Sequence, residues 1–229
     1  MIQKIGLAGL VLAFAACGST PSVSAPRPKA QARLAQIRVV GDAIEVPLPA
    51  GYCEPTGTYV DTAQVSAAGD SQNLTLLSLF SCAEMARGAT PEHFAYVKIP
   101  KSALSAHMTL PELLSGMGAV PDSEMKAAID NDKVSPGVQK DLSTVTGRDV
   151  AVHTAIVPAD RDANGYYMAG VVQMSAGTQE ITTAVAVALT AVKGHMLSYN
   201  FYAPGQTSEE VRAVLEQTKA ETKRLVAAN

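Results

Sequence analysis

The sequence predicts an α+β fold, an antiparallel sheet covered by helices, including a long C-terminal helix. Three observations support this prediction. Four strand-like segments follow one another through short turns, at residues 149–157, 166–174, 180–192 and 195–203. An amphipathic helix follows them, and residues 109–145 form a polar-faced helical block. Strands joined by short turns pair as antiparallel neighbours, and such a helix buries its apolar stripe against the sheet.

The N-terminal 16 residues have the three parts of an export signal. Lys4 supplies a positive charge, a short apolar run follows, and small residues precede Cys17. The run is shorter than the roughly 20 residues that cross a bilayer. No later segment is long enough either, so we do not expect an integral membrane protein.

Two interpretations are open for Cys17. Together with Ala15 and Ala16 it resembles the signal of a bacterial lipoprotein, in which the cysteine after two small residues is lipidated and becomes the first residue. Phe14 departs from that signal, where an aliphatic residue is usual. The alternative is ordinary cleavage, for instance after Ala15 or after Ala25. We predict lipidation, because it accounts for an otherwise unpaired thiol and because a tether-like segment follows.

The segment after this cysteine has the Pro, Ser and Ala content of a flexible linker. We therefore predict a signal peptide at 1–16, a lipid-anchored tether at 17–33 and a single globular domain at 34–229. Gly18 and Ser19, with no Asp after the cysteine, resemble lipoproteins retained at the outer membrane. The expected location is the periplasmic side of the cell envelope, with a fatty acid such as palmitate in the membrane.

Charge and aromatic content argue against some classes of function. All 21 Asp and Glu lie after residue 33, whereas four of the 18 Lys and Arg lie at or before it, so the globular part is acidic. An acidic domain lacks the basic surface that nucleic acid requires, and we expect no nucleic-acid partner. With no Trp, four Phe and seven Tyr, an aromatic-lined platform for sugars or nucleobases is not expected either.

The globular part contains two cysteines, Cys53 and Cys82. In an exported protein without a CxxC motif, one structural disulfide is the simplest interpretation. Closing a loop of this length stabilises a fold by about 3.5 kcal/mol on the chain-entropy model. A metal pair or a redox pair is the alternative, but the two cysteines lack the close spacing that either chemistry needs.

The first part of the domain is predicted as strands with one helix. From Ile37 the chain is extended with a turn at Gly41–Asp42, and prolines at 47 and 49 place this segment at a sheet edge. The elements that should follow are a helix at 59–68, a strand at 74–81, a turn after Cys82 and a strand at 94–99.

Helix-start signals mark the middle block. Thr109 and Glu112 have the spacing of a capping box. Asp122 should cap a second helix, and Ser135–Pro136 should begin a third, with proline at the first helical position.

The turn at Lys193–Gly194 allows a register to be predicted. If it is a two-residue hairpin turn, Ala186 pairs with Phe201 and Ala188 with Tyr199, so small residues mostly face large ones across the strands. A slip of one residue would lose this complementarity. The chain should end in a helix from about 208 to 227, opened by a capping box and laid across the sheet.

Several of these segments resemble a group of exported proteobacterial proteins and lipoproteins of unknown function. The resemblance rests on Pro49–Cys53 (PAGYC), on Phe80–Cys82 closing an apolar strand, and on the ending from Thr190 (TAVKGHMLSYNFYAP) with its final helix. It covers the early and late thirds of the chain and implies an exported, disulfide-bonded domain without implying an activity. The layout is also loosely similar to PsbP-like sandwiches, which are mostly non-enzymatic.

The sharpest motif for chemistry lies at 160–165. Asp160, Asp162 and Asn164 match alternate positions of a calcium loop, whose oxygens converge on a hard cation. The loop has Val171 where such sites carry a bidentate Glu, so a polar hairpin loop is the preferred interpretation. We predict no metal site and no cofactor, with these three residues as the candidate ligands should a metal bind.

No catalytic residue can be assigned from the sequence. The four histidines, at 93, 107, 153 and 195, are scattered, and no nucleophile motif is present. We expect a non-catalytic binding or envelope-assembly module that takes an unknown protein or a small apolar ligand. The alternative is a periplasmic hydrolase with a site near 109–145, where Ser or Asp would approach His107 or His153.

Overall fold

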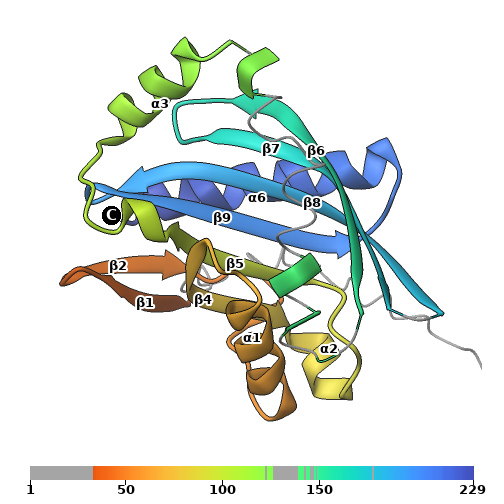
Figure 1. The fold of residues 1–229 in the computed structure, drawn as a ribbon. Coiled ribbons are helices and arrows are strands. Elements are labelled where there is room, and N and C mark those ends of the chain that lie inside the picture. Colours follow the sequence, from red (N-terminus) through yellow and green to blue (C-terminus); the bar gives the residue numbers. More distant parts are fainter. Residues whose placement is uncertain are drawn as a thin grey trace, which may run out of the picture. The chain divides into compact units, whose positions relative to one another are not determined.

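The chain forms an α+β fold, which confirms the predicted class (Figure 1). The computed structural model describes residues 33–121, 123–125, 139–141, 143, 144, 147, 149–176 and 178–229, although the side chains of 176 and 179 are excluded. Among these residues the strands form a seven-stranded antiparallel sheet in the order β3-β4-β5-β9-β8-β7-β6 and a separate two-stranded sheet, β1-β2. No helix in the described part of the chain is long and apolar enough to cross a membrane.

The strands are β1 Leu34–Val39, β2 Asp42–Pro47, β3 Tyr52–Cys53, β4 Asn73–Ser81, β5 Phe94–Pro100, β6 Ala151–Arg161, β7 Tyr166–Ala176, β8 Gln179–Val192 and β9 His195–Pro204. The helices are α1 Thr58–Ala68, α2 Cys82–Arg87, the 3-10 turn η1 Lys101–Ala103, α3 Leu110–Ala119 and α6 Ser208–Ala227. The predicted strands and the predicted helices at 59–68 and 208–227 are all present, with shifts of a few residues at their ends.

The β8–β9 hairpin has the predicted register. Ala186 pairs with Phe201 and Ala188 with Tyr199, and the turn residues Lys193 and Gly194 have φ angles of 50° and 82°. Positive φ at both turn residues gives the hairpin a twist that matches its strands. The small–large alternation therefore indicated the correct pairing.

One face of the main sheet is closed by α6, which packs on β8, β9 and β7 (Figure 1). The helix begins with the predicted capping box between Thr207 and Glu210. Its buried residues Val214 and Leu225 join a core built from alternate residues of the strands. Because the alanines of β8 on this face are small, the helix can lie close to the sheet.

The first hairpin differs from the prediction in two ways. Its turn is Val40–Gly41 rather than Gly41–Asp42, because Val39 pairs directly with Asp42. The hairpin also forms its own small sheet instead of an edge of the main one. Its inward residues, Ile37 and Ile44 among them, are almost completely buried and extend the core under α6.

The turn expected after Cys82 is a short helix, α2. The Ser81 hydroxyl accepts a hydrogen bond from the Glu84 backbone N–H, and Gly88 ends the helix in the left-handed conformation. The capping box predicted at Thr109 opens α3, as expected. The second and third caps of this block, at Asp122 and Ser135–Pro136, lie outside the described residues.

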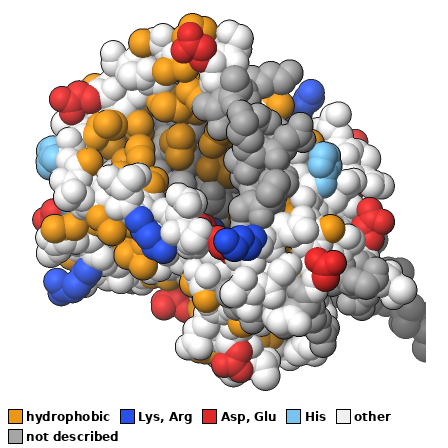
Figure 2. Space-filling view, viewed as in Figure 1, with side chains coloured by type: hydrophobic (Ala, Val, Ile, Leu, Met, Phe, Trp, Pro, Cys, Tyr) orange, Lys and Arg blue, Asp and Glu red, His pale blue; other side chains and the backbone are white. Residues whose placement is uncertain are grey.

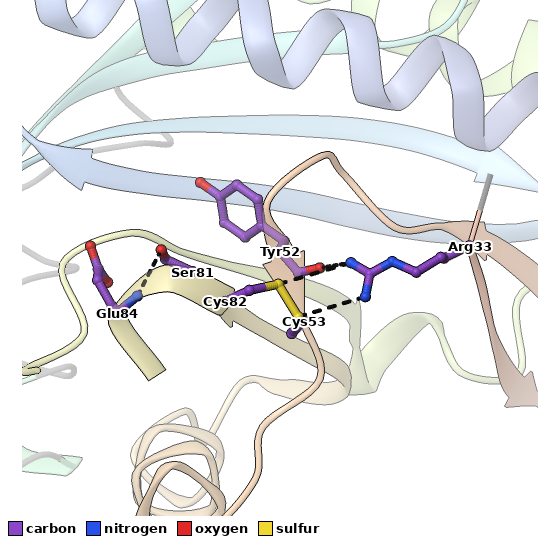
Figure 3. The surroundings of a disulfide bond; sticks show 6 residues. All are labelled: Arg33, Tyr52, Cys53, Ser81, Cys82 and Glu84. Atoms are coloured by element: carbon purple, nitrogen blue, oxygen red, sulfur yellow. Dashed lines mark hydrogen bonds between the residues drawn. A yellow bond between two sulfur atoms is a disulfide. The ribbon is translucent and has the colours of Figure 1, made fainter. Parts of the chain in front are cut away.

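Cys53 and Cys82 form the expected disulfide, which joins β3 to the start of α2 (Figure 3). Their Cα atoms are 5.2 Å apart, within the range that an unstrained bridge requires. The guanidinium group of Arg33 lies beside the bond, 3.6 Å from the sulfur of Cys53, and also donates to the carbonyl oxygen of Tyr52 (Figure 3). The bridge and Arg33 thus fasten the short edge strand β3 to its neighbours.

Candidate functional site

A cavity of about 630 Å³ lies on the face of the main sheet opposite α6. Figure 2 shows that this face is hollowed, with hydrophobic side chains along the wall of the hollow and charged side chains at its edge. The described residues that line the cavity come from the end of α1 and the loop after it, from the first residue of β4, from strands β5 to β9, and from Asp141. They are Ser66, Gly69, Asp70, Ser71, Gln72, Asn73, Phe94, Tyr96, Lys98, Asp141, Val152, Thr154, Ile156, Val172, Met174, Thr183 and Tyr202.

One side of the cavity is lined by aliphatic side chains, methionine and threonine. Thr154 pairs with Val172 and Val172 with Thr183, so these three residues form a row across β6, β7 and β8. Val152 and Met174 form the next row on the same face. The two rows lie on the same face because side chains two residues apart on a strand point to the same side of the sheet.

The other side of the cavity is aromatic. The rings of Phe94 and Tyr202 are stacked with their centroids 4.6 Å apart, and the ring of Tyr96 meets that of Tyr202 edge-on at 5.9 Å. Phe94 and Tyr202 are direct cross-strand partners on β5 and β9. Low aromatic content led us to expect no aromatic platform, but composition does not show where a few rings gather.

A glycine in β7 allows the backbone of β6 to come close to that of β7 beside the cavity. A Cβ atom on Gly170 would lie 1.9 Å from the carbonyl oxygen of Ala155 in β6, a distance at which no side chain fits. The backbone of β6 thus occupies the space in which a side chain at position 170 would stand. Glycine inside a strand commonly marks such a bend or close approach. Gly170 pairs with Ile156 of the cavity wall, so this close approach lies at the site itself.

A polar cluster stands at the edge of the cavity. The ammonium group of Lys98 is 2.7 Å from Oδ2 of Asp70 and 5.1 Å from the centre of the Tyr96 ring. Oδ1 of Asp70 accepts hydrogen bonds from the side-chain amide and the backbone N–H of Asn73. Asp141 accepts a bond from the backbone N–H of Ser71, which holds the same loop. The cluster is therefore fixed by its own contacts.

The surroundings of these groups set their protonation. Burial would raise the pKa of Asp70, but the charge and hydrogen bonds of Lys98 and Asn73 hold that pKa below its usual range. Burial raises the pKa of Tyr202 to about 12, and the nearby Asp70 carboxylate adds to the effect. At neutral pH the site therefore presents an ion pair and protonated tyrosine hydroxyls.

A second, more open hollow of about 400 Å³ lies beside the disulfide and includes Glu84 and His93. The buried Glu84 carboxylate lies 2.6 Å from Nδ1 of His93 and accepts the backbone N–H groups of Glu92 and His93. Burial opposes ionisation, but these partners lower the pKa of Glu84. These hydrogen bonds of the carboxylate hold the loop before β5 in place, which is a structural role.

The candidate calcium ligands have other partners. Asp160 forms an ion pair with Lys219 at 2.7 Å, and Oδ1 of Asp162 accepts the backbone N–H of Asn164 at 2.7 Å and the hydroxyl of Tyr167 at 2.9 Å. The backbone oxygen of Asn164 accepts the hydroxyl of Thr190. These contacts fold a hairpin loop between β6 and β7. In the part of the chain that the structure describes, no three His, Cys, Asp or Glu residues are grouped to hold a metal ion.

The histidines are dispersed in the fold. His93 pairs with Glu84, and Nε2 of His195 lies 2.9 Å from a carboxylate oxygen of Asp42. The ring of His107 packs against Gly194, and His153 is exposed on β6. Neither His107 nor His153 is among the described residues that line the cavity, whereas Asp141, from the 109–145 block of the hydrolase alternative, is one of them.

The cavity residues were missed at the level of sequence. The signal that could have found part of the site is the alternation in β5, where Phe94, Tyr96 and Lys98 share one face and carry two rings and a charge. The partners of these residues come from segments far away in the chain, such as Asp70 and Tyr202. Sequence spacing alone does not bring those together.

Comparison with known proteins adds a distant structural likeness. No family model matches the chain, and no curated protein matches it. The solution structure of cyanobacterial PsbP (CyanoP) from Synechocystis matches with a TM-score of 0.41 and 13% sequence identity, covering 90% of this chain and 96% of that one. The similarity is too low to carry function, which is inferred below from the chain's own residues.

Proposed function

We propose that this chain is a non-catalytic binding module of the bacterial cell envelope that holds a small, mostly apolar ligand in the cavity of the main sheet. The observation that carries the proposal is the cavity itself, with one aliphatic side, one aromatic side and a compact polar cluster at its edge. Its volume of about 630 Å³ falls within the range typical of small-molecule sites, which are mostly apolar with a few placed polar groups.

The chemistry of the polar cluster supports binding rather than catalysis. Asp70 is ionised and engaged by Lys98 and Asn73, so it is a poor general base. Tyrosine hydroxyls are already protonated at neutral pH, and burial raises the pKa of both Tyr96 and Tyr202 further from that range. Groups in these states can orient a ligand through hydrogen bonds, whereas proton transfer needs a pKa near the working pH.

The envelope location is the second part of the proposal. The export signal, the lipoprotein-like Cys17 and the tether to residue 33 support attachment to a membrane from its periplasmic side, at the outer membrane. The Cys53–Cys82 bond agrees with this location, because structural disulfides persist in oxidising compartments. The tether would let the domain collect ligand near the membrane surface.

A cavity-filling variant tests the binding proposal. Val172→Trp places a large ring inside the cavity, and Val157→Trp places the same ring at an exposed position on the neighbouring strand β6. Titration with the neutral dye Nile red should show saturable binding to the full chain at one site. Val172→Trp should weaken that binding at least about tenfold, and Val157→Trp should leave it unchanged.

Two results would count against the proposal. The first is the absence of saturable Nile red binding to the folded wild-type chain. The second is equal binding by the two tryptophan variants, which would place the dye somewhere other than the cavity. Circular dichroism of each variant establishes that the fold is retained.

A further inference from the structure

The Lys98 ammonium group has hydrogen-bonding capacity beyond its ion pair. An ammonium carries three donors, and the contacts of this one in the described structure are Oδ2 of Asp70 at 2.7 Å and the face of the Tyr96 ring. The side chain is 14% exposed and lines the cavity. The remaining donors therefore stand at the place where an apolar ligand would carry its polar end.

The position of the ammonium is fixed before any ligand arrives. Asp70 is held by both the side chain and the backbone of Asn73, and its own side chain is 19% exposed. Lys98 also lies over the Tyr96 ring, which restrains the end of its flexible chain. A donor that is already oriented loses little entropy on binding, so its hydrogen bond contributes more to affinity.

The charge of the cluster constrains the ligand. Lys98 is neutralised by Asp70, and a second carboxylate, Asp141, lines the same cavity. An anionic head group placed on Lys98 would bring a negative charge close to Asp70 in a partly buried site, where repulsion is strong. A neutral acceptor accepts the same hydrogen bond from Lys98 without that cost.

We propose that the ligand of this site is an apolar molecule whose polar end is a neutral hydrogen-bond acceptor, such as a ketone, ester or amide carbonyl, bound by Lys98. The inference rests on the proposed function and adds the class of ligand. In this arrangement Lys98 contacts the ligand directly, the rings of Phe94 and Tyr202 receive its apolar body, and Asp70 is a positioning residue. Asp70 also excludes fatty acids and other anionic amphiphiles of similar size.

Two dyes and three variants of the full chain test this inference. Nile red is neutral and has a carbonyl group, whereas 1-anilinonaphthalene-8-sulfonate (ANS) is anionic and has a sulfonate. Wild type should bind Nile red more tightly than ANS. Lys98→Met keeps the apolar stem and removes the donor, and it should weaken Nile red binding about tenfold. Lys223→Met removes an exposed lysine of α6 and should change nothing.

Asp70→Asn gives the sharpest readout, because it removes the counter-charge while Lys98 remains. ANS binding should strengthen about tenfold relative to Nile red binding, which reverses or abolishes the preference of the wild type. A merely structural role of Asp70 would weaken the binding of both dyes together. Circular dichroism and the unfolding midpoint of each variant separate loss of fold from loss of recognition.

The outcomes separate this inference from the proposed function. If neither dye binds the wild type at a saturable site, the proposed function is wrong and the inference falls with it. Suppose that Nile red binds the wild type and that Val172→Trp weakens this binding. If Lys98→Met then binds Nile red as tightly as Lys223→Met does, the proposed function stands and the role assigned to Lys98 is wrong. A wild type that prefers ANS, or an unchanged preference in Asp70→Asn, contradicts the neutral-acceptor class.

Discussion

The two faces of the main sheet are built from the same strands, but one face is covered by α6 and the other lines a cavity. On the face covered by α6, Tyr199 and Phe201 are fully buried. On the other face, the next residue along β9, Tyr202, is half-buried and lines a cavity. The comparison shows how a period of two lets one strand supply side chains to a closed core and, on its other face, to the wall of a cavity.

The largest effect should come from truncating neighbouring residues on the two faces. Phe201→Ala should lower the free energy of unfolding by about 3–5 kcal/mol, because it leaves a cavity in the closed core. Tyr202→Ala should lower it by about 1–2 kcal/mol, since that ring is half-buried, but it should weaken Nile red binding. Urea unfolding and dye titration of the two variants measure both quantities. If Phe201→Ala and Tyr202→Ala lowered the free energy of unfolding equally, the two faces would not differ in how much their side chains contribute to stability.

A smaller effect should appear in acid and should be confined to the open face. The pKa of Asp70 in the folded chain is lowered, so its ionisation contributes stability that is present above its unfolded pKa and is lost as the pH falls through the folded pKa. The stability of wild type relative to Asp70→Asn should therefore decrease as the pH falls below about 4. Thermal unfolding of both proteins across this range measures the difference, and parallel curves would contradict it.

The smallest effect on the stability of the sheet should come from a substitution in the predicted lipid anchor. Cys17→Ala should leave the unfolding midpoint of the globular part unchanged, because Cys17 lies in the predicted tether and not in the domain. It should abolish labelling by radioactive palmitate and move the protein from the membrane fraction to the soluble fraction. Cys17→Ala protein that is still labelled would show that the lipid is attached elsewhere, and unlabelled wild type would favour ordinary cleavage.

The closed face was largely predictable from sequence, whereas the open face was not. The register of β8 and β9 followed from alanines facing aromatic residues, and α6 followed from Thr207, Glu210 and a regular apolar stripe. Such patterns are local and periodic. The turn at Val40–Gly41 was misplaced by one residue because glycine and aspartate both favour turns, and the pairing of Val39 with Asp42 decided between them.

The cavity depends on relations that sequence order conceals. Lys98 pairs with Asp70, which lies 28 positions earlier in the chain. Tyr202 stacks on Phe94 although residues 109–145 separate them in the sequence. The polar and aromatic residues that form the site are individually ordinary. They come together because β5 and β9 are neighbours in the sheet although they are far apart in the sequence.

The close approach of β6 and β7 at Gly170 separates the backbone of the site from its side chains. Because the backbones of β6 and β7 come close together at this position, the spacing of the two strands there does not depend on the side chains that line the cavity. Substitutions of Val152, Val172 or Met174 would change the shape of the cavity wall while leaving the spacing of the two strands unchanged. A single glycine thus fixes how closely two strands approach each other beside the cavity, independently of the side chains that line it.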